Sequence, residues 1–257
     1  MAKIVSIHSF HGGTGTSTTA ANLTALIAQT GKRVGVVDTD IQSPGIHVLF
    51  NLDDKCIDKS LNDYLWGKCP IEDAAYDCSA TLSIDGGEVA EQGAGMYLIP
   101  SSIKSGDMAR VLREGYDVNL LNAGFRELTR RLKLDYLLID THPGLNEETL
   151  LSITLSDILI IIMRPDQQDF QGTAVTVDVA RRLDVPRLML VVNKVLPRYD
   201  LKAVGRQVAQ TYDAEVAGVL PLSEDVVGLA SGGIFALKYP DHPLTQRYRQ
   251  IAAKVMG

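Results

Sequence analysis

Short, continuous apolar runs recur along the 257-residue chain, and segments with helical periodicity separate them. Runs typical of strands lie at 3–9, 33–38, 96–100, 135–140, 157–163, 187–193 and 216–220. Helical segments are expected at 16–30, 117–132, 145–155, 169–183, 200–212 and 243–255. Strands that are apolar throughout, rather than at alternate positions, are typical of parallel sheets covered by helices on both faces. The pattern therefore predicts an α/β fold with a doubly wound, mostly parallel sheet of seven or eight strands.

Residues 51–95 interrupt this alternation. They contain short amphipathic pieces, and the sequence IDGGEV (84–89) is typical of a β-hairpin. The chain shows no internal repeat and no low-complexity tract. We interpret 51–95 as a surface elaboration of a single domain that spans 1–257.

Composition narrows the class of protein. A hydrophobic content of 46% and a charged content of 22% are ordinary for a soluble globular protein. The net charge of −6 argues against a surface that is basic all round, although a local basic patch stays open. Apolar runs such as ILIIIM (158–163) are too short to span a bilayer, and no signal peptide precedes the first strand. We therefore expect a cytoplasmic protein.

Three cysteines, Cys56, Cys69 and Cys78, lie in the interrupting segment. Their spacings match no common zinc or CxxC pattern, and their odd number does not suit a closed disulfide framework. We interpret them as reduced, structural thiols.

A glycine-rich sequence, HGGTGTSTTAANL (11–23), follows the first strand directly and opens the first helix. Gly12, Gly13 and Gly15 allow successive backbone N–H groups to point into one concavity at the positive end of that helix. Ser17 stands where phosphate-binding loops carry the hydroxyl that ligates Mg²⁺. The loop taken alone is also compatible with a tight strand-to-helix turn that binds nothing.

Three aspartates strengthen the interpretation as a phosphate site. Asp38 and Asp40 lie at the end of the second strand, and Asp140 ends the strand at 135–140. The carboxyl ends of parallel strands form the edge where open α/β sheets bind ligands. Each aspartate alone is equally typical of a helix cap. Together with the glycine-rich loop, they predict a site for Mg²⁺ and a nucleotide.

The order of these motifs resembles that of the MinD/ParA family of P-loop ATPases. The resemblance rests on the sequence from His11 to Gly45, followed by LIPSS, LLIDTHPG, VVNK and GVLPLSEDV, and it covers nearly the whole chain, with 51–95 the poorest match. It implies that ATP and Mg²⁺ bind, that two chains dimerise face to face around two ATP molecules, and that hydrolysis to ADP reverses the dimer. Family members use this cycle to position or regulate a cellular assembly.

The resemblance also implies roles for individual residues. The residues that would surround the phosphates are His11, Gly12, Gly13, Thr14, Gly15, Thr16, Ser17 and Thr18. Ser17 would ligate Mg²⁺, while Asp38 and Asp140 would hold the water molecules of the metal. Asp40 would orient the attacking water. Asn193 would read the adenine, and Pro221 would begin the segment that closes over the base.

The loop departs from the family pattern at two positions. The signature lysine of the family aligns with His11, and the ordinary Walker lysine aligns with Thr16. One charge-assisted hydrogen bond contributes about 1.5–3 kcal/mol, so we expect nucleotide binding to be weakened but retained. Loss of a preorganised charge slows a reaction about 10²–10³-fold, so we expect slow hydrolysis. Arg164 and Lys194 also follow strands, and we interpret them as ion-pair or loop residues outside the site.

The surfaces available to partners are less distinctive. In the final helix, Leu244, Tyr248, Ile251, Ala252 and Val255 share one face, which favours a core helix over a membrane anchor. Basic groups at 126–133 and 180–187 are candidates for non-specific DNA contacts, although such groups are usually solvated helix faces. The resemblance suggests a partner-protein surface at 164–183.

Three hypotheses follow. The first is an ATP-dependent, dimerising switch with slow hydrolysis. The second is a scaffold that does not hydrolyse nucleotide and acts through an unidentified partner protein. A metal-carrier or biosynthetic relative is the third and weakest, because the sequence shows no cysteine-pair motif and no further substrate motif.

Overall fold

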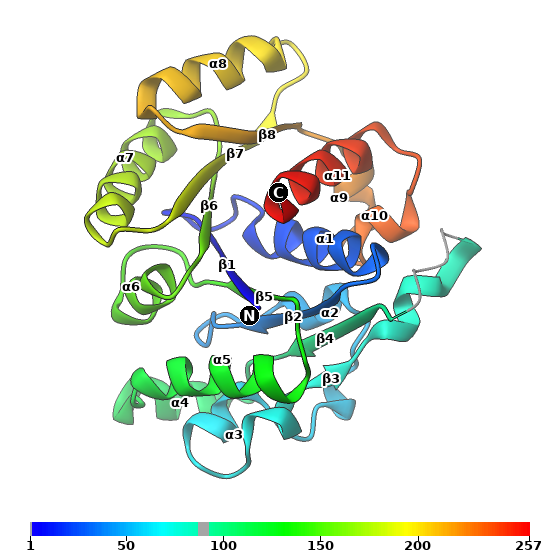
Figure 1. Ribbon diagram of the computed structural model, residues 1–257, viewed down its shortest axis with the longest axis vertical. Helices are drawn as coiled ribbons and strands as arrows, with labels where there is room; N and C mark the ends of the chain where they lie inside the picture. Colours follow the sequence, from blue (N-terminus) through cyan, green and yellow to red (C-terminus); the bar gives the residue numbers. More distant parts are fainter. Residues whose placement is uncertain (1, 87–92) are drawn as a thin grey trace.

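The computed structural model describes residues 2–86 and 93–257 (Figure 1). In this part of the chain, eight strands form one sheet in the order β3-β4-β2-β5-β1-β6-β7-β8. The strands are β1 (Lys3–His8), β2 (Arg33–Asp38), β3 (Tyr76–Asp77), β4 (Gly95–Ile99), β5 (Tyr136–Asp140), β6 (Ile158–Met163), β7 (Arg187–Val195) and β8 (Glu215–Pro221). All neighbouring strands run parallel except β3, which is antiparallel to β4. The predicted doubly wound, mostly parallel sheet is confirmed.

Helices cover both faces of this sheet. They are α1 (Thr16–Gln29), α2 (Ile46–Leu49), α3 (Leu61–Leu65), α4 (Ser105–Glu114), α5 (Asn119–Arg131), α6 (Glu147–Thr154), α7 (Gln167–Arg182), α8 (Leu201–Tyr212), α9 (Glu224–Leu229), α10 (Phe235–Lys238) and α11 (Pro243–Met256). Figure 1 shows α1 and α11 on one side of the sheet, and α5, α6 and α7 on the other.

Alternate residues of the central strands supply the core on each side, because successive side chains of a strand point to opposite faces. Leu138 of β5 belongs to the cluster under α1 and α11, whereas its neighbour Leu137 belongs to the cluster under α5. Ile161 of β6 packs in a third cluster with α7 and α8. Burial on both faces explains why these strands are apolar throughout.

The final helix packs against the core, as its spacing predicts. All five residues of its apolar face are buried, and α11 contacts α1 and β8. Among the residues that the structure describes, no helix is both long and apolar enough to cross a bilayer.

The segment 51–95 differs from the expected surface elaboration. It supplies β3 to the sheet, and Leu61 and Ile71 lie fully inside the cluster under α5. Of the expected hairpin, 84–86 end a 3-10 helix (Ser79–Gly86) instead, while 87–89 lie outside the described residues. The three cysteines are free thiols.

Candidate functional site

The glycine-rich loop connects β1 to α1 and takes the shape of a tight turn. Gly13 and Gly15 have positive φ angles of 74° and 99°, which favour glycine. A Cβ atom on Gly15 would lie 2.4 Å from Nδ2 of Asn193, so no larger residue fits there without movement. Gly15 caps α1 without a side-chain hydrogen bond. The first N–H groups of α1 are therefore available to an anion.

Hydroxyl groups stabilise the loop from within. The Thr16 hydroxyl donates to Ser9 Oγ at 3.0 Å and lies 3.2 Å from the hydroxyl of Thr14. Ser9 in turn donates to the carbonyl oxygen of His11 at 2.9 Å. Thr16 thus takes part in the internal structure of the loop at the position where a Walker lysine would extend toward phosphates.

His11 is directed away from the loop. Its Nδ1 lies 2.7 Å from Oδ1 of Asp169 on α7, and Arg164 Nε donates to Oδ2 of the same carboxylate at 3.0 Å. Burial raises the pKa of Asp169, but the hydrogen bonds from Arg164 and His11 outweigh it and hold this pKa below its ordinary value. Arg164 is an ion-pair residue, as predicted, and the carboxylate of Asp169 contacts both Arg164 and His11.

Two carboxylates lie side by side under the loop. Asp38 and Asp140 are partners in the register of β2 and β5, and both are almost completely buried. Burial and the neighbouring Asp40 raise the pKa of Asp38 to about 7. Burial and Asp38 raise the pKa of Asp140 well above its ordinary value, and a hydrogen bond from Ser17 only partly offsets this.

This carboxylate pair fits a hydrated magnesium ion. Oδ1 of Asp140 is buried without a hydrogen-bond partner in the described structure, and buried polar atoms normally have one. A cation with bound water would satisfy this oxygen and offset the repulsion between the two carboxylates. Across residues 2–86 and 93–257, no cluster of three or more His, Cys, Asp or Glu side chains is arranged to hold a metal ion alone. Mg²⁺ would therefore take ligands from Ser17, from water and from the nucleotide.

Asp40 is held by a histidine that the sequence analysis missed. Nδ1 of His142 lies 2.7 Å from Asp40 Oδ1, and the Ser43 hydroxyl donates to Oδ2 at 2.9 Å. Because an ionised carboxylate only accepts, Nδ1 carries the hydrogen. The signal was the histidine in DTHPG, two residues after Asp140.

The residues expected at the base lie together beside the loop. Asn193 donates from Nδ2 to the carbonyl oxygen of Thr14 at 2.8 Å. A cavity of about 150 Å³ opens next to it. Its lining residues are Gly15, Thr18, Asn193, Lys194, Pro221, Leu222, Ser223, Val226, Val227, Leu244 and Tyr248. The structure thus brings Asn193 and Pro221 to one cavity adjoining the helix start.

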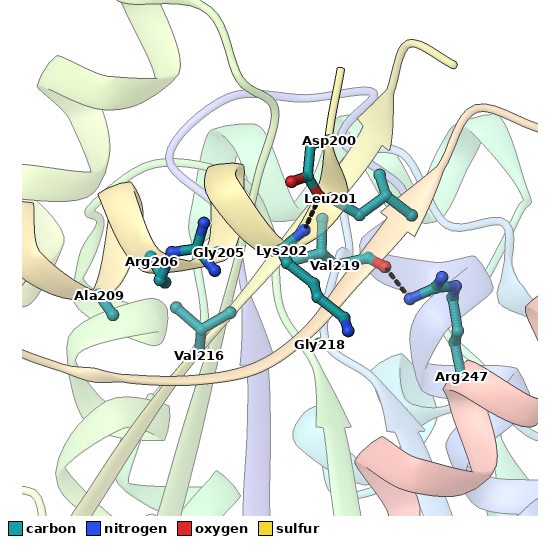
Figure 2. Close-up of a pocket in the computed structure, with 10 residues that line it drawn as sticks. All are labelled: Asp200, Leu201, Lys202, Gly205, Arg206, Ala209, Val216, Gly218, Val219 and Arg247. Atoms are coloured by element: carbon teal, nitrogen blue, oxygen red, sulfur yellow. Dashed lines mark hydrogen bonds between the residues drawn. The ribbon is translucent and has the colours of Figure 1, made fainter. Parts of the chain in front are cut away.

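A larger groove, of about 720 Å³, lies at the β8 edge of the sheet between α8 and α11 (Figure 2). Val216 and Val219 of β8 form its floor, and Lys202 and Arg206 project from α8 (Figure 2). Arg247 of α11 donates to the carbonyl oxygen of Val219 at 3.3 Å. None of the residues predicted for the nucleotide lines this groove.

An uncapped helix start is suited to bind anions, and buried carboxylates beside it are suited to hold a hydrated metal ion. Both features at the carboxyl edge of a parallel sheet, after a glycine-rich turn, are typical of P-loop nucleotide-binding proteins. A family model described as an AAA domain matches residues 2–185. The chain belongs to the MinD/ParA family of P-loop ATPases.

Individual relatives agree with this assignment. An uncharacterized ATP-binding protein of Methanocaldococcus jannaschii is 30% identical over 259 residues, which cover 100% of this chain and 89% of that protein. The septum site-determining protein MinD of Bacillus subtilis is 23% identical over 100% of this chain and 90% of its own length. The structure of MinD complexed with Mg-ADP from Pyrococcus horikoshii superposes with a TM-score of 0.80 at 23% identity, covering 99% of this chain and 96% of that one.

Proposed function

We propose that this chain is a nucleotide-dependent switch that positions or regulates a cellular assembly. Mg·ATP binds at the loop between β1 and α1, and two chains then close face to face around two nucleotides. Slow hydrolysis to ADP reopens the dimer. The MinD structure with Mg-ADP and the septum site-determining relative support this proposal by similarity.

The buried pair of Asp38 and Asp140 is the observation that carries the proposal. Burying two neighbouring carboxylates is unfavourable, and their raised pKa values reflect this cost. A fold retains such a pair when a ligand compensates for it. Mg²⁺ with nucleotide phosphates does so at this position, next to the free N–H groups of α1.

Asp40 is the residue that we propose to orient the attacking water. Its carboxylate is fixed by His142 and Ser43, so its direction is set before substrate binds. When Mg²⁺ is bound, it offsets negative charge on the phosphates. Neither His11 nor Thr16 directs a positive charge into the loop, and this absence supports slow turnover.

The test is to measure Mg·ATP binding and phosphate release for the unmodified chain, Thr16→Lys, Asp40→Ala and Asp140→Asn. We expect binding in the unmodified chain and in Asp40→Ala, with turnover lost in Asp40→Ala and increased in Thr16→Lys. Asp140→Asn should lose the Mg²⁺ dependence of binding. No Mg·ATP binding by the unmodified chain at millimolar nucleotide would refute the proposal.

A scaffold that binds nucleotide without hydrolysing it is the second candidate, and the absence of both loop lysines favours it. It predicts binding without any phosphate release in the unmodified chain. Turnover that appears only in Thr16→Lys would select the scaffold over the switch.

We propose the α8–β8–α11 groove as the surface for non-specific DNA contacts. In the two basic groups identified from sequence, Arg130 and Arg131 pair with Glu127, and Arg182 pairs with Asp178. The side chains of Lys202 and Arg206 make no ion pair within the described residues, and neither do those of Arg126 and Lys133 in the first basic group, but Lys202 and Arg206 line one groove. Unpaired cations around one groove are better placed to contact phosphates.

A further inference from the structure

His8 is a fully buried histidine at the end of β1, where the loop to α1 begins. The strand lies in the middle of the sheet, with β5 on one side and β6 on the other. Burial, together with the nearby His142, lowers the pKa of His8 to about 3, so its ring is neutral at pH 7. A neutral imidazole ring has one N–H donor and one acceptor nitrogen.

The hydrogen bonds of Thr141 decide which nitrogen of His8 carries the hydrogen. The Thr141 hydroxyl donates to the carbonyl oxygen of Ile7 at 3.1 Å, and a hydroxyl has only one hydrogen to donate. Nδ1 of His8 lies 2.8 Å from the same hydroxyl oxygen, so Nδ1 is the donor. Nε2 is then an acceptor, and it is buried without a hydrogen-bond partner in residues 2–86 and 93–257.

The stability of the fold does not explain a histidine at this position. A buried polar atom without a partner is unfavourable, whereas an apolar side chain of similar size has no such atom. Ile161, the neighbour of His8 in the register of β6, is apolar and fully buried. We therefore look for the role of His8 in its one hydrogen bond, the bond to Thr141.

This hydrogen bond fixes the turn after β5. Thr141 is buried and directly precedes His142. It accepts from His8, and its N–H and hydroxyl both donate to the carbonyl oxygen of Ile7. Three hydrogen bonds to consecutive residues of β1 hold Thr141 in one orientation, so the backbone enters His142 in a fixed direction.

The segment that carries Asp40 is tied to the same turn. The N–H and the hydroxyl of Thr39 both donate to the carbonyl oxygen of Asp140, each at 2.9 Å. From the other side, the Thr149 hydroxyl of α6 donates to the carbonyl oxygen of His142 at 3.3 Å. Asp40 and His142 thus meet at 2.7 Å between two backbone segments that hydrogen bonds hold in place.

We propose that His8 is a positioning residue for ATP hydrolysis. Through Thr141 it sets the direction of His142, and His142 sets the direction of the Asp40 carboxylate that orients the attacking water. His8 acts through these residues and not on the reacting atoms. This inference rests on the proposed function, because it adds a residue to the group that acts on the attacking water of that same site.

The test measures phosphate release, Mg·ATP affinity and urea unfolding for the unmodified chain, His8→Leu and His8→Asn. His8→Leu should lower kcat about tenfold or more, while KM and Mg·ATP affinity change less than about twofold, because a displaced catalytic group slows the reaction without weakening binding. Its urea midpoint should stay the same or rise, since the unpaired nitrogen is gone. His8→Asn should retain most of kcat, because its amide N–H can replace the Nδ1–H donor.

A double variant tests whether His8 acts through His142. His142→Leu alone removes the donor to Asp40. If His8 positions this donor, adding His8→Leu should slow hydrolysis less than about twofold further, because changes along one chain of contacts are not additive. Effects that multiply would show that His8 acts independently of His142 and would overturn the proposal.

Ser6→Ala is the matched control. Ser6 lies two residues earlier in β1 and is fully buried, and its hydroxyl donates to the carbonyl oxygen of Ser152 in α6 at 3.0 Å. This variant should lower the urea midpoint and leave kcat unchanged, which is the reverse of the pattern expected for His8→Leu.

An unchanged kcat in His8→Leu would overturn the role of His8 alone. So would a loss of kcat that comes with an equal loss of Mg·ATP affinity or of stability, since that pattern marks a purely structural side chain. If the unmodified chain binds Mg·ATP but releases no phosphate, the proposed hydrolysis is overturned together with this inference.

Discussion

His142 contacts Asp40, the residue that we propose to orient the attacking water. It donates from Nδ1 to Asp40 at 2.7 Å. An asparagine side chain places its amide N–H close to the position of a histidine Nδ1–H, whereas leucine has no donor. We predict that His142→Leu slows ATP hydrolysis about 10- to 100-fold through misplacement of Asp40, with little change in Mg·ATP affinity, and that His142→Asn retains most of the rate.

Steady-state phosphate release and nucleotide titrations check this prediction. His242→Leu is the control, because His242 also pairs with a carboxylate, that of Asp225, but on the surface. Full turnover in His142→Leu would show that Asp40 needs no histidine. Equal slowing in His142→Asn would point to a role of the ring other than donating to Asp40.

At the scale of residues, the sequence could predict the candidate site residues that lie at the ends of strands. Asp38 and Asp140 each follow an apolar run, and the register of parallel strands pairs them. His142 was missed because its partner Asp40 lies 102 residues away in sequence. Their contact depends on the turn after β2, which has no periodic signal.

At the scale of elements, Asp169 connects three segments of the structure. It accepts from the backbone N–H and side chain of Arg164 after β6, and it binds His11 of the loop. Because its pKa is lowered in the fold, its stabilising effect is complete above the unfolded-state value of about 4. This effect is lost as the pH falls through the lowered folded-state pKa.

We predict that Asp169→Asn lowers the free energy of unfolding by about 1–3 kcal/mol at pH 7, and that the difference from the unmodified chain narrows below about pH 4. Urea denaturation at a series of pH values measures both effects. Asp178→Asn is the control, since its exposed pair with Arg182 on the same helix contributes at most about 0.5 kcal/mol. A difference that persists unchanged at low pH would assign the effect to packing rather than charge.

The groove between α8 and α11 gives a second prediction at this scale. If it contacts DNA, Lys202→Glu/Arg206→Glu should weaken binding to a labelled duplex about tenfold or more, and it should flatten the salt dependence. Arg130→Glu/Arg182→Glu tests the paired basic groups and should have a smaller effect. Anisotropy titrations at several salt concentrations measure both variants. If Arg130→Glu/Arg182→Glu weakens DNA binding more than Lys202→Glu/Arg206→Glu does, the DNA surface lies at the basic groups 126–133 and 180–187.

The elements themselves show where sequence patterns are informative. The six predicted helices and seven predicted strands agree with the structure within two residues at each end. Helix α4 was missed although its apolar residues Met108, Val111 and Leu112 have helical spacing, because its sequence is short and mostly polar. The helices α2, α3, α9 and α10 span six residues or fewer, which is too short for a helical period to be visible.

At the scale of the whole molecule, we propose that the dimer of the switch forms through the face beside the loop. Val175 of α7 is 48% exposed, and it lines a surface hollow of about 420 Å³ together with Phe10, His11, Gln168, Gln171 and Gly172. Val175 is the exposed large apolar side chain of this hollow, and we propose it as a contact of the dimer. The hollow adjoins the loop through His11, so a partner chain seated there would lie next to the proposed nucleotide site.

We predict that the chain sediments as a monomer without nucleotide and as a dimer at saturating Mg·ATP. Val175→Glu should keep Mg·ATP affinity and remain monomeric, because an unpaired carboxylate at an apolar contact is costly to bury. Lys32→Glu is the control. Lys32 is exposed just before β2, at the amino-terminal end of the strands and away from the loop, so this variant should dimerise normally. Sedimentation velocity at several protein concentrations distinguishes the two states.

A chain that stays monomeric when calorimetry shows the site to be saturated would contradict the dimerising switch while leaving nucleotide binding intact. A dimer that forms equally in Val175→Glu would place the interface on another face.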